Sequence, residues 1–173
     1  MSEEIQIFIS HKKEDEKKAI KLSDYIEENF GFSTYVDVLD DKIHEYENVT
    51  ERIVSQLRNS THLLVVFSEH TKKSMWVPFE LGVAYEREEG IGVYIWPDNP
   101  YMLPDYDLPE YLEEFPKMKD TYGLNKYLNL IKEKPNKQKL LLEAKESLGF
   151  TKRAAEINYA QEFINELKKR LGQ

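Results

Sequence analysis

The sequence predicts an α/β fold in which a parallel sheet of four to five strands carries helices on both faces. Three observations lead to this prediction. Short apolar runs alternate with stretches of helical periodicity over the first 96 residues, and the linkers between them are short. The run at 62–68 (HLLVVFS) is the most continuous apolar run, as in a central strand covered on both sides. Glycines and a proline stand where helices would end or begin.

The first strand is expected at residues 5–10 (IQIFIS), a β-rich run followed by polar residues. A helix follows, with Ala19, Leu22, Ile26 and Phe30 on one stripe, and Gly31 is expected to end it in a left-handed conformation. Residues 33–38 (STYVDV) form the second predicted strand because β-branched and aromatic side chains favour strands.

Residues 39–46 (LDDKIHEY) are interpreted as a charged loop, after which Val49, Ile53 and Leu57 repeat at helical spacing. The central strand at 62–68 comes next. A third helix is predicted over 75–89, with Pro78 in its first turn and Gly90 as its end, and residues 91–96 (IGVYIW) form the fourth strand.

Beyond Trp96 the composition of the sequence changes. Residues 97–111 are rich in proline and tyrosine and are interpreted as a loop, and residues 124–131 as a short helix or an edge strand. Residues 138–148 and 154–171 have helical patterns. We therefore divide the chain into a main domain at 1–135 and a C-terminal helical extension at 136–173 that packs on the same domain.

Composition limits the possible functions. The 173 residues include 24 Lys and Arg against 32 Asp and Glu, for a net charge of -8, which argues against a nucleic-acid or anionic-membrane partner. Cysteine is absent, so thiolate nucleophiles and cysteine metal sites are excluded. The four histidines lack metal-ligand spacing, and no metal or cofactor is expected. Without a signal-like N-terminus or a long apolar stretch, the expected location is the cytoplasm.

Ligands of doubly wound sheets bind beyond the carboxyl ends of the strands. Neither a glycine-rich phosphate loop nor a GxSxG elbow is present there, which leaves Trp76 and Glu80, four residues apart and near one helix face. An ionised carboxylate beside an aromatic plate could hold a sugar and a flat base. By spacing alone, the alternative stays open that Trp76 is a half-buried anchor and Glu80 a solvated first-turn acid.

Four segments in register resemble a known family. Phe8-Ile9-Ser10-His11, Tyr35-Val36-Asp37-Val38, Leu64-Val65-Val66-Phe67-Ser68 and Trp76-Val77-Pro78-Phe79-Glu80 are similar to the motifs of TIR (Toll/interleukin-1 receptor) domains, and the similarity runs from residue 5 to about residue 120. The stand-alone layout resembles bacterial TIR proteins of antiphage defence, including the Thoeris type.

The resemblance implies a flavodoxin-like fold and an enzyme that cleaves NAD+ at the nicotinamide–ribose bond, with NAD+ as substrate rather than cofactor. Glu80 takes the place of the family's catalytic glutamate and Trp76 that of the aromatic residue before it. Substrate contacts are implied for Phe8, Ser10, His11, Lys12 and Asp37. Many members have an arginine near Lys12, and lysine offers charge without a bidentate fork. The product would be ADP-ribose, a cyclic isomer or a conjugate.

The resemblance also implies partners. TIR domains self-associate, so the loop at 39–46 is a candidate contact, and a messenger nucleotide would require a separate effector protein that senses it. Two other functions stay open. The chain could be a non-catalytic TIR scaffold, or an enzyme like the nucleoside deoxyribosyltransferases, which would use Glu80 as a nucleophile.

Overall fold

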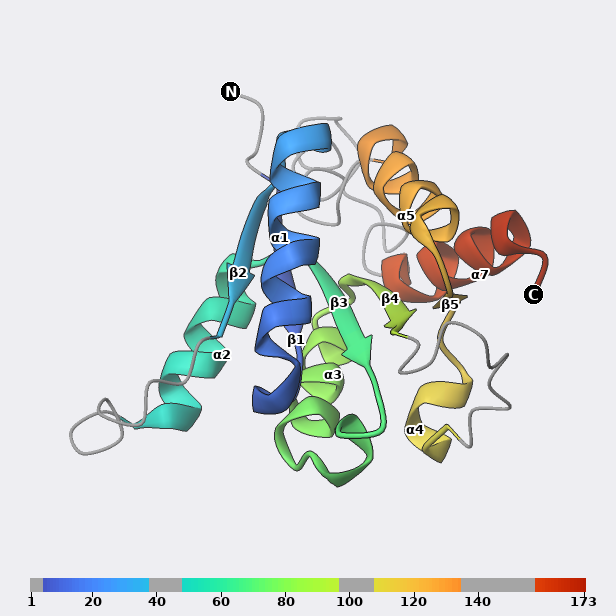
Figure 1. Ribbon diagram of the computed structural model, residues 1–173. Coiled ribbons are helices and arrows are strands. Elements are labelled where there is room, and N and C mark those ends of the chain that lie inside the picture. Colours follow the sequence, from blue (N-terminus) through green and yellow to red (C-terminus); the bar gives the residue numbers. More distant parts are fainter. Residues whose placement is uncertain (1–4, 38–47, 97–107, 135–157) are drawn as a thin grey trace, which may run out of the picture.

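The computed structural model describes residues 5–37, 48–96, 108–134 and 158–173 (Figure 1). Five strands and six helices alternate along these residues, with short 3-10 turns at Lys13–Asp15 and Thr71–Lys73. In chain order they are β1 (Gln6–Ser10), α1 (Glu16–Phe30), β2 (Ser33–Val36), α2 (Val49–Asn59), β3 (His62–Phe67), α3 (Trp76–Glu86), β4 (Gly90–Ile95), α4 (Glu110–Glu113), β5 (Lys117–Met118), α5 (Thr121–Glu133) and α7 (Tyr159–Leu171).

The strands form one parallel sheet in the order β2-β1-β3-β4-β5. β1 and β3 are neighbours near its middle, with Ser10 paired to Val65, and all six residues of β3 are buried. Because all the strands point the same way, their carboxyl ends meet at one edge, as the sequence predicted. The predicted α/β architecture is confirmed.

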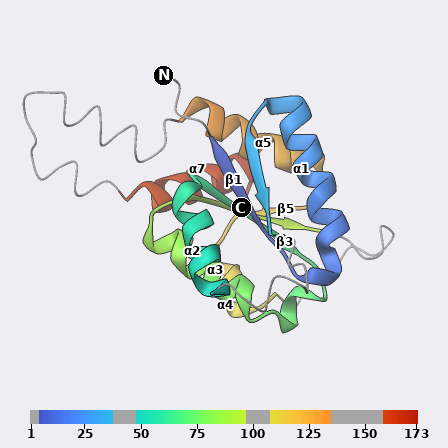
Figure 2. The same ribbon diagram turned by 90° about the vertical axis from the view of Figure 1, so that its left-hand side faces the viewer.

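Strand alternation divides the core into two layers. Ile7, Ile9, Leu64 and Val66 pack against α1, α5 and α7, whereas the residues between them pack against α2 and α3. Figure 2 shows α1 and α2 on opposite sides of the sheet. α7 also fills the core, since Tyr159, Phe163 and Leu167 belong to the α1 layer. The domain boundary at residue 135 stays a prediction.

The predicted end of α3 is wrong. The helix stops at Glu86, Glu88 has the left-handed φ of 57°, and Gly90 is the first residue of β4 rather than the residue that ends the helix. Gly90 pairs with His62, and a Cβ there would lie 2.4 Å from Cδ2 of the imidazole. Glycine is therefore required at this position by the packing of a neighbouring strand.

Several other boundaries differ from expectation. α3 begins at Trp76, one residue later than predicted, and the predicted loop at 97–111 gives way to α4 at Glu110. Of the two alternatives for 124–131, the helix is confirmed, since the segment lies within α5. The strand β5 has only two residues and gave no sequence signal. The segments 39–46 and 138–148 lie outside the described residues. None of the described helices has both the length and the apolar character needed to cross a membrane.

Candidate active site

A cleft opens where the ends of β1 and β2 meet the start of α3. Every predicted site residue except Ser10 lines this cleft, namely Phe8, His11, Lys12, Asp37, Trp76 and Glu80. Four further residues complete its lining: Ile9, Lys13, Glu16 and Ser74. Its empty volume of about 520 Å³ includes the space open at its mouth.

Glu80 is the buried acid of this cleft, with 4% of its surface exposed. It is the fifth residue of α3, one turn beyond the start, where the Val77 amide donates to Ser74 Oγ over 3.2 Å. The interpretation of Glu80 as a solvated first-turn acid is therefore wrong. Burial raises the pKa of Glu80 to about 7, although the hydrogen bond from Ser10 acts to lower it and the charge of Asp37 raises it further.

Ser10 lies behind Glu80 rather than in the wall of the cleft. Its side chain is 1% exposed, and its hydroxyl donates to Glu80 Oε2. As the last residue of β1, Ser10 shares the face of Phe8, which packs in the layer of α2 and α3. Sequence reasoning placed Ser10 against the nucleotide; in the structure its hydroxyl contacts the glutamate.

Asp37 follows β2 and is held by two residues that sequence reasoning missed. The Tyr35 hydroxyl donates to Asp37 Oδ1 over 3.3 Å, and Arg52 Nη2 of α2 lies 3.4 Å from the same oxygen. The Tyr35 ring also packs on Phe8, with centroids 5.3 Å apart. Burial, and then the neighbouring Asp37, raise the pKa of Tyr35 to about 12, so the phenol keeps its proton and donates it. Strand alternation could have indicated Tyr35, but only the packing of α2 brings in Arg52.

Trp76 provides an aromatic wall at the start of α3. Its ring meets that of Phe79 edge to face, with centroids 5.7 Å apart. Phe79 is 37% exposed, and Met75, which precedes Trp76 in the sequence, is 85% exposed. The indole is half-buried, so one part is anchored by packing while another part lines the cleft.

Cationic side chains also line the cleft, from the connection between β1 and α1. Lys12 and Lys13 contribute ammonium groups, and His11 Nδ1–H donates to the Ile9 carbonyl over 3.1 Å. That bond leaves His11 Nε2 as an acceptor in the neutral ring. Within residues 5–37, 48–96, 108–134 and 158–173, no group of three metal-ligating side chains is present. The lining of the cleft thus combines three carboxylates, two aromatic side chains, an imidazole and two ammonium groups.

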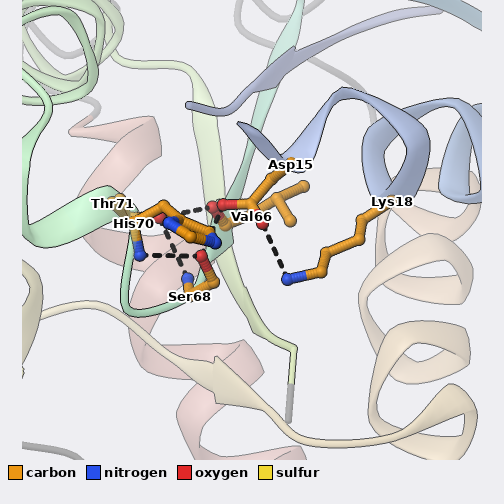
Figure 3. A network of polar contacts seen from close by, with 6 residues as sticks. All are labelled: Asp15, Lys18, Val66, Ser68, His70 and Thr71. Atoms are coloured by element: carbon orange, nitrogen blue, oxygen red, sulfur yellow. Dashed lines mark hydrogen bonds and ion pairs between the residues drawn. The ribbon is translucent and has the colours of Figure 1, made fainter. Parts of the chain in front are cut away.

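A second buried carboxylate lies beside the cleft, in a polar network that joins α1 to the end of β3 (Figure 3). Asp15 is completely buried; it accepts from Ser68 Oγ over 2.5 Å and from Lys18 Nζ over 2.7 Å. Ser68 Oγ also accepts from the His70 amide over 3.1 Å, while Thr71 Oγ1 accepts from the Ser68 amide over 2.9 Å and donates to the Val66 carbonyl over 3.2 Å. Lys13 and Glu16, which flank Asp15 in the sequence, line the cleft, whereas Asp15 itself does not.

The comparisons with known proteins agree on one family. A family model described as "TIR domain" matches residues 7–110. A probable 3' cyclic ADP-D-ribose synthase, ThsB' of Bacillus cereus (strain MSX-D12), is 36% identical over 128 residues, which are 72% of this chain and 57% of the relative. A probable 2' cyclic ADP-D-ribose synthase, TcpO of Methanobrevibacter olleyae, is 32% identical over 77 residues, 44% of this chain and 22% of the relative.

The chain therefore spans little more than half of one relative and less than a quarter of the other. A solved structure supports the fold independently of these relatives. The TIR domain of the Toll-related receptor TRR-2 from Hydra magnipapillata superposes with a TM-score of 0.52 at 19% identity, covering 73% of this chain and 95% of that domain. At this level of identity the similarity concerns the arrangement of the sheet and its helices.

Proposed function

This chain belongs to the TIR domain family, and on that premise we propose that it is an enzyme that consumes NAD+ by cleaving the bond between nicotinamide and ribose. The observation that carries the proposal is Glu80: a carboxylate with 4% exposure, in a cleft, that has no cationic partner among the described residues. A buried acid without a cation is costly, and the structure keeps one where a ligand can reach it.

NAD+ supplies the missing positive charge. Its nicotinamide ring is cationic, and as the ring leaves as a neutral base the ribose acquires oxocarbenium character. A carboxylate beside the ribose stabilises that developing charge, as carboxylates do in glycoside hydrolysis. A bound cation also lowers the pKa of Glu80 from its value of about 7, so the substrate itself favours the ionised form of the acid.

The remaining wall residues suit the other parts of the dinucleotide. We propose that Trp76 stacks on a base, that Asp37 accepts from ribose hydroxyls, and that Lys12 and His11 lie near the diphosphate. Phe8 forms the apolar floor, because it is fully buried apart from its contact with the cleft. Ser10 is the exception, since its hydroxyl is occupied by Glu80.

We further propose that the acceptor of the ribosyl group is internal to the substrate. Both curated relatives are named as synthases of cyclic ADP-ribose. In such a reaction the anomeric carbon loses nicotinamide and bonds to a nucleophile of the same molecule, whose proton is released. Water as the acceptor would give linear ADP-ribose instead, and another nucleophile a conjugate.

The resemblance to bacterial defence proteins suggests the biological role. We propose that the product is a messenger in antiphage immunity, that a separate effector protein senses it, and that the domain self-associates during activation. The negative net charge of -8 supports a partner other than nucleic acid.

The test is to incubate NAD+ with the purified chain and to separate the products by chromatography with mass detection, beside Glu80→Gln as control. We expect nicotinamide release that the variant lacks, and a second product with the mass of cyclic ADP-ribose. A product of the mass of ADP-ribose would identify a hydrolase.

Absence of nicotinamide release, at high protein concentration and in phage-challenged cells, would contradict the proposal and favour a scaffold. Base exchange on free deoxynucleosides would instead identify an enzyme of the deoxyribosyltransferase type. The same chromatography detects either outcome.

A further inference from the structure

We infer that Ser10 is a positioning residue that holds Glu80 by one oxygen, Oε2, and leaves the other, Oε1, for the substrate. The inference rests on the proposed function, because it assigns Ser10 a part in the work of Glu80. It departs from the expectation that Ser10 touches the nucleotide, since the side chain is 1% exposed and does not line the cleft.

The geometry gives Ser10 a fixed place from which to act. β1 is bonded to β2 on one side and to β3 on the other, and Ser10 pairs with Val65 of β3. A serine at the end of such a strand has little backbone freedom. Its hydroxyl therefore anchors one carboxylate oxygen of α3 to the centre of the sheet.

The two oxygens of Glu80 are consequently not equivalent. Oε2 accepts the Ser10 hydrogen bond, while Oε1 has no hydrogen-bond partner in the described part of the chain. Because the carboxylate belongs to the lining of the cleft, Oε1 is the oxygen available to a ligand. An anchor on one oxygen restricts rotation of the carboxylate, which is the kind of preorganisation that catalysis requires.

The hydrogen bond also stabilises the ionised acid. A hydroxyl donates well to a carboxylate, and this contact opposes the burial that raises the pKa of Glu80. Removing the donor leaves Oε2 buried without a partner, and the pKa of Glu80 then rises above its value of about 7. At neutral pH a smaller fraction of the enzyme would have the carboxylate.

Ser68, just beyond the end of the neighbouring strand β3, provides a matched control. Its side chain is fully buried, and it donates to the buried carboxylate of Asp15 over 2.5 Å. Asp15 does not line the cleft. Ser68→Ala therefore removes the same type of hydrogen bond, at a similar depth, without touching Glu80.

The experiment measures kcat/KM for NAD+ between pH 5 and pH 9 for the wild-type chain, Ser10→Ala, Ser10→Thr and Ser68→Ala. In the wild type we expect activity to rise with pH as Glu80 ionises. In Ser10→Ala the midpoint should move up by about one pH unit, and activity at pH 7 should fall about fivefold, because the wild-type midpoint lies at about 7. Ser10→Thr, which retains the hydroxyl, should restore the midpoint, and Ser68→Ala should leave it unchanged.

A second measurement separates this inference from the proposed function. The carboxyl carbon of Glu80, assigned by its loss in Glu80→Gln, can be titrated by carbon-13 NMR without any substrate. A higher pKa in Ser10→Ala would support the inference even if NAD+ were not consumed. An unchanged titration would overturn it even if NAD+ were consumed. Should Ser10→Ala fail to fold, Ser10→Cys replaces it, because a thiol fills similar space and donates weakly.

Discussion

Two serine–carboxylate pairs lie at the ends of neighbouring strands, and they differ first in whether a cation accompanies the carboxylate. Ser10 donates to Glu80 at the end of β1, and Ser68 donates to Asp15 just beyond β3. Both carboxylates are buried. Asp15 has the Lys18 ammonium at 2.7 Å, whereas Glu80 has no cation among the residues that the structure describes.

On the proposed function, the difference separates a carboxylate with a structural role from one that takes part in the reaction. A buried carboxylate with a cation and a hydroxyl is satisfied, and it fixes the connections around it. A buried carboxylate without a cation keeps much of the free-energy cost of leaving water, and a ligand that brings positive charge would offset that cost. The two pairs also lie on opposite faces of the sheet, since Ser10 bonds to a residue of α3 and Ser68 to the residue before α1, and of the two carboxylates Glu80 alone lines the cleft.

The largest expected effect is on turnover. Glu80→Gln keeps the shape of the side chain and removes its charge, so we expect NAD+ consumption to fall by at least about 1,000-fold. The variant should nevertheless be more stable than the wild type. At pH 8 it does not bury an ionised carboxylate, whose pKa burial raises to about 7, and we expect its free energy of unfolding in urea to be higher by about 1–3 kcal/mol. A folded variant with wild-type turnover would refute the role of Glu80.

Asp15→Asn should give the reverse pattern. The change removes the anion that Lys18 and Ser68 bind inside the domain, and we expect a loss of about 2–4 kcal/mol of unfolding free energy. Turnover per folded molecule should stay within about threefold, because Asp15 does not line the cleft. Urea unfolding checks the first value and active-site-normalised kinetics the second. A stable but inactive Asp15→Asn chain would break the comparison.

Glu89 sharpens the comparison because it is a third buried carboxylate, outside the cleft. It is 4% exposed, Arg87 Nε lies 3.1 Å from one oxygen, and burial raises its pKa to about 8. An acid whose pKa is higher in the folded state costs stability as the pH rises toward that pKa. We expect the wild-type chain to lose about 1–2 kcal/mol between pH 7 and pH 9, and Glu89→Gln to lose less.

The measurement for Glu89 is urea unfolding at several pH values with NAD+ turnover as the accompanying readout. The window stays above pH 7 because His62, whose pKa burial lowers to about 3, acts in the opposite direction below its unfolded value of 6.5. If the free energy of unfolding fell equally with pH in the wild type and in Glu89→Gln, the expectation would be contradicted. Lost turnover in Glu89→Gln would show that a raised pKa outside the cleft also matters for the reaction.

The smallest expected effect concerns Trp76. Trp76→Phe retains a flat ring at the cleft, and we expect KM for NAD+ to rise about twofold to threefold, whereas Trp76→Ala should raise it about tenfold. The unfolding free energy of Trp76→Phe should change little because the indole is half-buried. Steady-state kinetics of the two variants is the check, and equal KM values would exclude stacking on this ring.

The sequence by itself determined the first four strands and the helices α1, α2 and α3, because periodicity and turn residues are local properties, but it gave no signal for β5 and placed the start of α4 in a loop. It placed Gly31 at the end of α1, where the left-handed φ of 67° requires glycine, and it brought Glu80, Trp76 and Asp37 to one edge of the sheet through the topology of parallel strands. It misread Gly90, whose role is set by the imidazole of His62 on the adjacent strand.

Only the tertiary structure decided how the carboxylates are paired. Ser10 and Glu80 are 70 residues apart, and Ser68 and Asp15 are 53 apart. Strand register determines which face each serine meets, and one residue of shift would exchange the faces. Burial, which raises the pKa of Glu80, comes from side chains of several elements at once, so no local pattern contains it.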